Sequence, residues 1–81
     1  MLAGLEKAAK VVGIKQTKKA IRESRAVKVY LAADAEERVL RPIHELCREG
    51  SVTVDMVESM NELGAACGIE VGAAAVALIR E

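Results

Sequence analysis

The stretch AVKVYLAADAEE, residues 26–37, decides the fold class because it joins a strand signal directly to a helix-start signal. Its apolar and β-branched first half predicts a buried strand over residues 28–32. Asp34 is a favourable helix N-cap residue, and Glu37 follows at the third position, as in a capping box. A strand that leads at once into a helix is the building unit of α/β folds.

The segments after this stretch continue the alternation. The helix that begins at Asp34 should end at Glu49, with a break near Pro42 and a left-handed stop at Gly50. The run SVTVDMV that follows predicts a second strand.

A second capping box then starts another helix. Ser59 and Glu62 form this box, and the helix should run through Cys67 and end at Gly68. A short loop, residues 69–72, and a closing strand, AAAVALIR, complete the chain.

The segments before residue 26 predict a helix over residues 2–10, a short strand at Val11 and Val12, and a helix over residues 13–25. Gly13 begins the last of these, with Gln16 as its capping-box acceptor. Strands alternating with helices indicate right-handed crossovers and helices on both faces of the sheet. We expect one domain, residues 1–81, folded as a three-layer α/β/α sandwich with a small mixed sheet.

The composition excludes several classes of protein. Of the 81 residues, 52% are hydrophobic, which excludes a disordered chain, and Tyr30 is the only aromatic residue, which argues against a base-stacking platform. The sequence has no signal-peptide pattern and no apolar run of membrane-spanning length. The two cysteines, Cys47 and Cys67, are twenty residues apart and form no C-x-x-C motif. So sparse a set of cysteines is typical of a reduced, cytoplasmic protein.

The net charge of zero conceals an asymmetry. Residues 1–28 contain eight Lys or Arg against two Glu, a formal charge of +6, whereas residues 29–49 sum to −2 and residues 50–81 to −4. On a helix over residues 13–25, five cations share about a third of the circumference. These cations are Lys15, Lys18, Lys19, Arg22 and Arg25, and the opposite side carries Ile14, Thr17, Ala20, Ile21 and Ser24. A face built only for solubility normally mixes both signs, so the cation face favours contact with nucleic acid over a merely solvated surface.

Other chemistry-bearing residues have simpler explanations. His44 and Cys47 are spaced like metal ligands, but with Cys67 they lack a fourth ligand, so packing explains them better. Asp34, Glu36 and Glu37 are explained by helix capping rather than by acid–base catalysis. With no nucleophile–base arrangement, we expect neither an enzyme nor a bound metal or cofactor.

Three segments, in the correct order, resemble the motifs of the L7Ae/L30e family of ribosomal and kink-turn RNA-binding proteins. GIKQTKKAIR resembles its G-T-N-E-x-x-K motif, VYLAADAEE its V-x-I-A-x-D segment, and LGAACGIEVGAAAVAL its closing motif. The short chain is most similar to the small bacterial members. The resemblance implies an α/β/α sandwich that binds a kink-turn, an RNA loop bent sharply by sheared G·A pairs beside a three-nucleotide bulge. Because the bend opens the major groove, side chains can reach guanine edges there.

The resemblance also implies the residues of an RNA site. Guanine edges would be contacted by Lys15, Gln16 and Lys19, and phosphate by Arg22. Gly13, which has no side chain, would let the protein backbone approach the RNA closely. Three further groups would complete the set, namely Lys18 and Lys28 at the rim, Asp34 in the second motif, and Ile69, Glu70 and Val71 in a loop over the bulge.

The chain departs from the family pattern at several positions. Lys15 and Gln16 stand where Asn and Glu are typical, Glu58 and Met60 replace a basic pair, and Gly72 replaces Pro. We therefore expect fewer phosphate contacts and a more mobile loop. A monomer bound to structured RNA, free in the cytoplasm or on the ribosome, is the main hypothesis. The alternative is a protein-interaction module that uses the loop at residues 69–72 or a sheet edge, with incidental cations.

Overall fold

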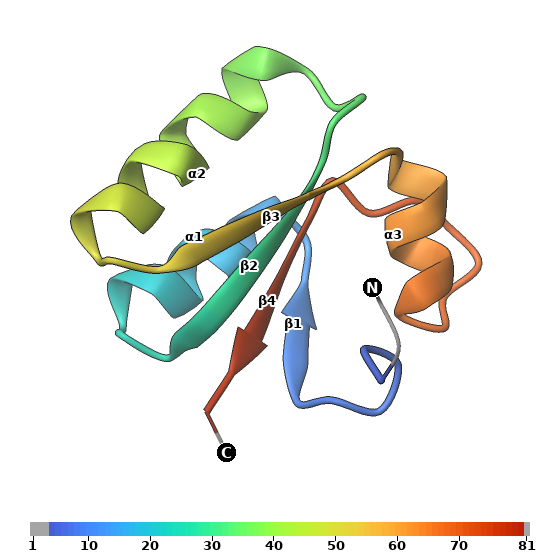
Figure 1. Cartoon of the computed structure of the whole chain (residues 1–81), viewed down its shortest axis with the longest axis horizontal. Coiled ribbons are helices and arrows are strands. Elements are labelled where there is room, and N and C mark those ends of the chain that lie inside the picture. Colours follow the sequence, from blue (N-terminus) through green and yellow to red (C-terminus); the bar gives the residue numbers. More distant parts are fainter. Residues whose placement is uncertain (1–3, 81) are drawn as a thin grey trace.

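Residues 4–80 are described by a computed structural model, which shows seven helices and strands in the order β1, α1, β2, α2, β3, α3, β4 (Figure 1). The strands are β1 (Lys10–Val12), β2 (Ala26–Ala32), β3 (Thr53–Val57) and β4 (Ala75–Ile79). The helices are α1 (Ile14–Arg22), α2 (Glu37–Glu49) and α3 (Met60–Ala66). No helix within residues 4–80 has both the length and the hydrophobicity that crossing a membrane requires.

The four strands form one mixed sheet in the order β1-β4-β2-β3, which confirms the predicted fold class. The central strand β4 runs antiparallel to both β1 and β2, whereas β2 and β3 are parallel, with Val29 opposite Val54. A parallel pair requires a crossover connection, and α2 supplies it. The strand predicted at Val11 and Val12 is present as β1.

The sheet separates two hydrophobic cores, as a three-layer fold requires. On one face, α1 and α2 cover Val29 and Leu31, while on the other face α3 covers Tyr30 and Ala32 (Figure 1). Side chains on a strand alternate between faces, so the continuously apolar strand β2 serves both cores. Fully buried Ala75 and Ala77 face the α1/α2 core, where their small side chains leave room for the helices to pack on the sheet.

Three local predictions are wrong for reasons outside the local sequence. Residues 4–8 form turns instead of the expected helix, because Gly4 has a φ of 87° and the buried Leu5 fills the α3 core. Residues 2 and 3 of that prediction lie outside the described part. Helix α2 continues through Pro42 without a break. The left-handed residue that follows this helix is Ser51, with a φ of 56°, and not Gly50, whose φ is −91°.

The second capping box is confirmed. The Ser59 hydroxyl accepts a 3.1 Å hydrogen bond from the Glu62 amide at the start of α3. Beyond the C-cap residue Cys67, Gly68 has a φ of 80°, a left-handed conformation that glycine adopts without strain.

Candidate nucleic-acid interface

Helix α1 has a buried face and a cationic face, as the periodicity predicted. Thr17, Ala20 and Ile21 are buried against the sheet. The opposite face carries Lys15, Lys18, Lys19 and Arg22, of which Lys18 is half-buried and the others are exposed. Within residues 4–80, none of these four cations lies within 4 Å of an acidic group. No acidic group of the described residues therefore relieves their mutual repulsion by direct pairing.

Gly13 gives α1 its starting point. Its φ of 114° is a conformation that side-chain-bearing residues rarely adopt, and its carbonyl accepts the first helical hydrogen bond, from the Thr17 amide at 2.9 Å. The expected cap from Gln16 is wrong, because no side chain caps α1. The Gln16 side chain is instead exposed beside Lys15 and is available to a ligand.

Two further cations do not belong to this face. Helix α1 ends at Arg22, and Arg25 follows a left-handed Ser24, with its guanidinium 3.3 Å from the Glu23 carboxylate. Lys28 shares a sheet face with Tyr30, on the side opposite α1. Its Nζ is 2.8 Å from the Asp55 carboxylate and 5.4 Å from the centre of the Tyr30 ring. This bond to Asp55 raises the pKa of Lys28.

The loop of residues 69–72 packs along α3. Its amide at Ile69 donates to the Gly64 carbonyl at 3.1 Å, and the Ala73 amide donates to the Met60 carbonyl at 3.1 Å. Ile69 is partly buried against the α3 core, so much of its side chain has a structural role. Val71 is 70% exposed, and Glu70 is also exposed. Of the two apolar side chains expected to cover a bulged nucleotide, only Val71 projects fully into solvent.

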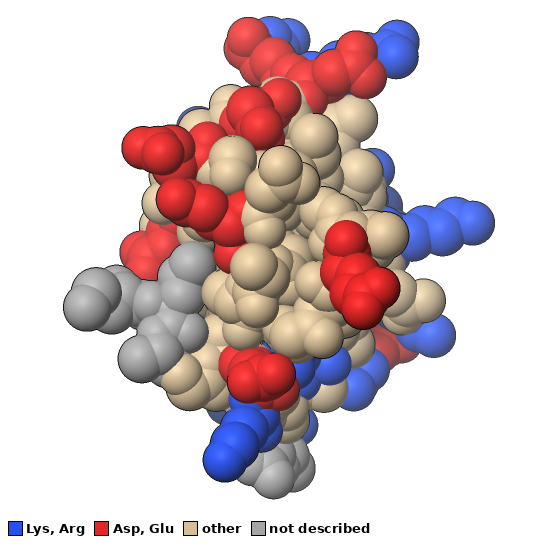
Figure 2. Space-filling model, turned by 90° about the vertical axis from the view of Figure 1, so that its right-hand side faces the viewer, with Lys and Arg blue, Asp and Glu red and all other residues tan. Residues whose placement is uncertain are grey.

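Hydrogen bonds bring this loop and the start of α1 to the same end of the sheet. The Gly13 amide donates to the Ala75 carbonyl at 2.8 Å, at the first residue of β4. Val71 lies four residues before Ala75, so their Cα atoms are at most about 14 Å apart. Figure 2, which views the molecule from the α3 side, shows Lys and Arg side chains projecting from one margin of the molecule. One extended ligand can therefore reach both segments.

The expected capping of α2 by Asp34 is wrong. The N-cap residue of α2 is Glu36, and no side chain caps that helix. The Asp34 carboxylate instead accepts a 2.9 Å hydrogen bond from the Met60 amide, at the first turn of α3. This contact joins the end of β2 to α3, and only the folded chain could show it.

The alternative metal and acid–base sites are not formed. Cys47 belongs to the α1/α2 core and Cys67 to the α3 core, so the two thiols lie on opposite sides of the sheet and cannot share a metal with His44. No cluster of three potential metal ligands occurs within the described residues. Glu37 is 2.8 Å from Arg41, which lowers the pKa of the carboxyl group by hydrogen bonding and charge.

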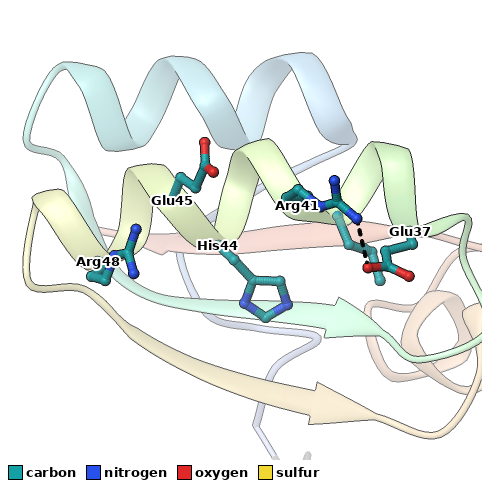
Figure 3. A pocket seen from close by; sticks show the side chains of 6 residues that line it. Glu37, Arg41, His44, Glu45 and Arg48 are labelled. Carbon is teal, nitrogen blue, oxygen red and sulfur yellow. Dashed lines mark hydrogen bonds and ion pairs between the residues drawn. The ribbon is translucent and has the colours of Figure 1, made fainter.

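Sequence reasoning did not anticipate a depression of about 610 Å³ along α2 (Figure 3). Its lining residues are Glu37, Leu40, Arg41, His44, Glu45 and Arg48. All of them come from this single helix, so the depression has no opposing wall. Its cations and anions alternate, which gives no preference for an anionic ligand.

Comparison with protein families decides the identity of the chain. Residues 3–81 match the model of the ribosomal protein L7Ae/L30e/S12e/Gadd45 family. The chain belongs to this family. The assignment confirms the resemblance of the three sequence motifs, and it also confirms that the chain is not an enzyme.

Several relatives of this L7Ae-family chain are small bacterial proteins. An RNA-binding protein of Geobacillus sp. (strain WCH70) is 49% identical over 70 residues, covering 86% of this chain and 85% of the relative. An RNA-binding protein of Caldanaerobacter subterraneus subsp. tengcongensis is 47% identical over 68 residues, covering 84% and 83%. The large ribosomal subunit protein eL8 of Haloquadratum walsbyi is 40% identical over 68 residues, covering 83% of this chain but 57% of that protein.

Solved structures share the fold of this L7Ae-family chain. A protein of unknown function from Bacillus halodurans superimposes with a TM-score of 0.89 at 22% identity, covering 98% of this chain and 83% of that one. The 15.5 kD RNA binding protein of Giardia lamblia gives a TM-score of 0.82 at 24% identity, covering 99% and 68%.

Proposed function

We propose that this L7Ae-family chain binds RNA and that its targets are kink-turns, which it stabilises in their bent form in ribosomal or regulatory RNA. The observation that carries the proposal is the cation face of α1, which has no acidic partner among residues 4–80 and begins at the same end of the sheet as the exposed Val71. The names of the bacterial relatives support the RNA-binding part of this proposal.

The proposed contacts divide into three groups. Lys15, Gln16 and Lys19 read base edges in the opened groove, since an ammonium donates to guanine O6 and N7 and an amide both donates and accepts. Lys18 and Arg22 hold phosphates on the same helix. The exposed Val71 and the backbone beside Glu70 cover the extruded nucleotides of the bulge.

Bending is the output of this binding, and it needs no chemical step. Free kink-turn RNA exchanges between extended and bent forms, and a protein that binds only the bent form increases its population by mass action. The protein acts as a monomer in the cytoplasm under this proposal. Recognition by groove edges and bent shape also fits a chain with a single aromatic residue, Tyr30, which is buried.

The test is a titration with fluorescently labelled RNA. A duplex with tandem G·A pairs and a three-nucleotide bulge should bind at least about tenfold more tightly, or 1.4 kcal/mol, than the same duplex with Watson–Crick pairs or without the bulge. Energy transfer between dyes on the two arms should rise with protein. Equal affinity for all three RNAs would reject kink-turn recognition while leaving RNA binding intact.

Salt dependence separates RNA binding from the protein-interaction alternative. Neutralising phosphates releases counterions, so the affinity for RNA should fall steeply with salt. An apolar interface through the loop of residues 69–72 would respond weakly. Failure to bind any RNA at low salt would reject the proposal as a whole.

A further inference from the structure

The chain segments at the RNA-facing end of the sheet lie in a fixed row. The end of β1, the start of β4 and the ends of β2 and β3 follow one another across the sheet. Hydrogen bonds hold the row together: Ala32 N–H to Ala74 O at 2.9 Å, and Ala33 N–H to Val57 O at 2.7 Å. Three interstrand spacings of about 4.8 Å place the residues beyond β3 about 14 Å from Gly13.

Two carboxylates stand at the far end of this row from α1. Asp34 and Glu58 each follow one partner of the Ala33–Val57 hydrogen bond, so both residues lie just beyond the ends of the adjacent strands β2 and β3. Both are exposed, and neither has a basic group within 4 Å among the described residues. Asp34 is additionally fixed by the Met60 amide at 2.9 Å.

The loop of residues 69–72 lies beside these carboxylates. The Met60 carbonyl accepts from the Ala73 amide at 3.1 Å, and Gly72 packs against the Met60 side chain. The same loop reaches the start of α1 through Ala75. The site therefore has cations on one flank of the loop, and on the other flank carboxylates that have no basic partner among residues 4–80. Figure 2 shows a group of acidic side chains at the upper left of the view, while other acidic groups lie near its centre, its top and its lower edge.

We propose that Asp34 and Glu58 form an electrostatic boundary of the RNA site, which keeps the phosphate backbone on the α1 side of the loop. The inference rests on the proposed function. A phosphate within a Debye length of these carboxylates, about 10 Å at 0.1 M salt, is repelled by both charges. One duplex arm of the bent RNA lies on α1, and the other arm leaves the protein surface instead of lying over the ends of β2 and β3.

Charge-neutralising variants test the boundary directly. Asp34→Asn retains an oxygen that can accept from the Met60 amide, and Glu58→Gln keeps the size of its side chain. Each should raise the affinity for kink-turn RNA about two- to fourfold in 50 mM salt, and the gain should disappear near 0.5 M. Glu58→Lys should also steepen the dependence of log affinity on log salt by about one unit.

A charge-matched control variant and a footprint of the bound RNA test whether the effect is specific to this position. Glu49→Gln changes the formal charge equally, but Glu49 is exposed at the last turn of α2, at the opposite end of the sheet, and should raise the affinity less than either boundary variant. In hydroxyl-radical footprinting, wild type should protect one arm of the RNA, and the double variant D34N/E58K should extend protection into the second arm.

The outcomes distinguish this inference from the proposed function. Wild type that binds kink-turns while Asp34→Asn and Glu58→Gln match Glu49→Gln overturns the boundary alone. Wild type that protects both arms equally also overturns it. Wild type without affinity for any kink-turn overturns the proposed function itself. Circular dichroism and thermal unfolding of each variant establish that the folded proteins are being compared.

Discussion

The carbonyl of Val71 occupies the space that a side chain at Gly64 would need. A Cβ built on Gly64 would meet the Val71 oxygen and carbon and the Gly72 Cα, all of them backbone atoms. Gly64 lies inside α3 and is fully covered, so this glycine serves neither a helix end nor a turn. It allows the loop of residues 69–72 to lie directly on the helix.

Replacing Gly64 by Ala should lower the free energy of unfolding by about 1–3 kcal/mol, because overpacking outweighs the higher helix propensity of alanine, about 1 kcal/mol. Urea denaturation measures the change. Gly50→Ala is the control, since a Cβ there meets its nearest atom at an ordinary 3.4 Å, and it should be neutral or slightly stabilising. Equal stability of both variants would show that the loop moves freely off α3.

Val71 and Ile69 should respond differently to an acidic substitution. Val71→Asp should weaken RNA binding without affecting stability, because the side chain is 70% exposed. Ile69→Asp should lower the thermal midpoint, because it brings a charge toward the α3 core. Binding titrations and melting curves on both variants check this. A Val71→Asp protein with wild-type affinity would remove the loop from the RNA site.

Lys19→Ala should reduce RNA affinity and lower the slope of log affinity against log salt by about one unit if the side chain neutralises a phosphate. If it reads guanine, selectivity should instead relax by about 1–3 kcal/mol. Lys28→Ala is the matched control, because Lys28 pairs with Asp55 on the sheet face away from α1. A larger loss from Lys28→Ala than from Lys19→Ala would contradict the assignment of the binding face to α1.

Thr17→Val should stabilise the protein by about 1 kcal/mol. Thr17 is fully buried, and its hydroxyl oxygen has no hydrogen-bond partner among the described residues. Valine has the same shape and removes the desolvation cost of that hydroxyl. Chemical denaturation should also show Thr17→Ser to be destabilised, because serine keeps the hydroxyl and loses the methyl group. A destabilised Thr17→Val would indicate that the hydroxyl has a polar partner.

Both thiols should be unreactive in the folded protein. Burial raises the pKa of Cys47 and of Cys67 above the ordinary thiol value. The thiolate is therefore disfavoured, and labelling with a disulfide reagent at pH 8 should await unfolding. The folded state binds more protons than the unfolded state above pH about 8.5, so stability should decline as the pH rises past that value. Rapid labelling of both thiols in buffer would contradict this prediction.

The sequence predicts the fold best where local signals and tertiary contacts agree, as at Ser59, whose cap is formed as expected. It fails where distant contacts decide. Residues 5–8, Leu-Glu-Lys-Ala, are good helix formers, but burial of Leu5 and pairing of β1 with β4 give this segment turns. Helix α2 continues through Pro42 because Leu40 before it and Ile43 after it are both buried in the α1/α2 core, and this packing stabilises the helix.

The same limit applies to the candidate site. Helical periodicity predicts the cation face, because burial of Thr17, Ala20 and Ile21 fixes the orientation of α1. Arg25 is misplaced because the left-handed Ser24 follows the end of the helix. The partners of Lys28 and Asp34, which are Asp55 and Met60, lie on other elements of the fold. No local pattern encodes such pairings.

The hydrogen bond from Gly13 to Ala75 joins segments near the two ends of the chain, so the proposed RNA surface exists only while the protein is folded. A ligand that binds the folded form alone adds about 2.7 kcal/mol of stability at a free concentration 100 times its dissociation constant. For a domain of 81 residues with a small core, that increment is a large share of the total. The RNA and the protein would each hold the other in its ordered shape.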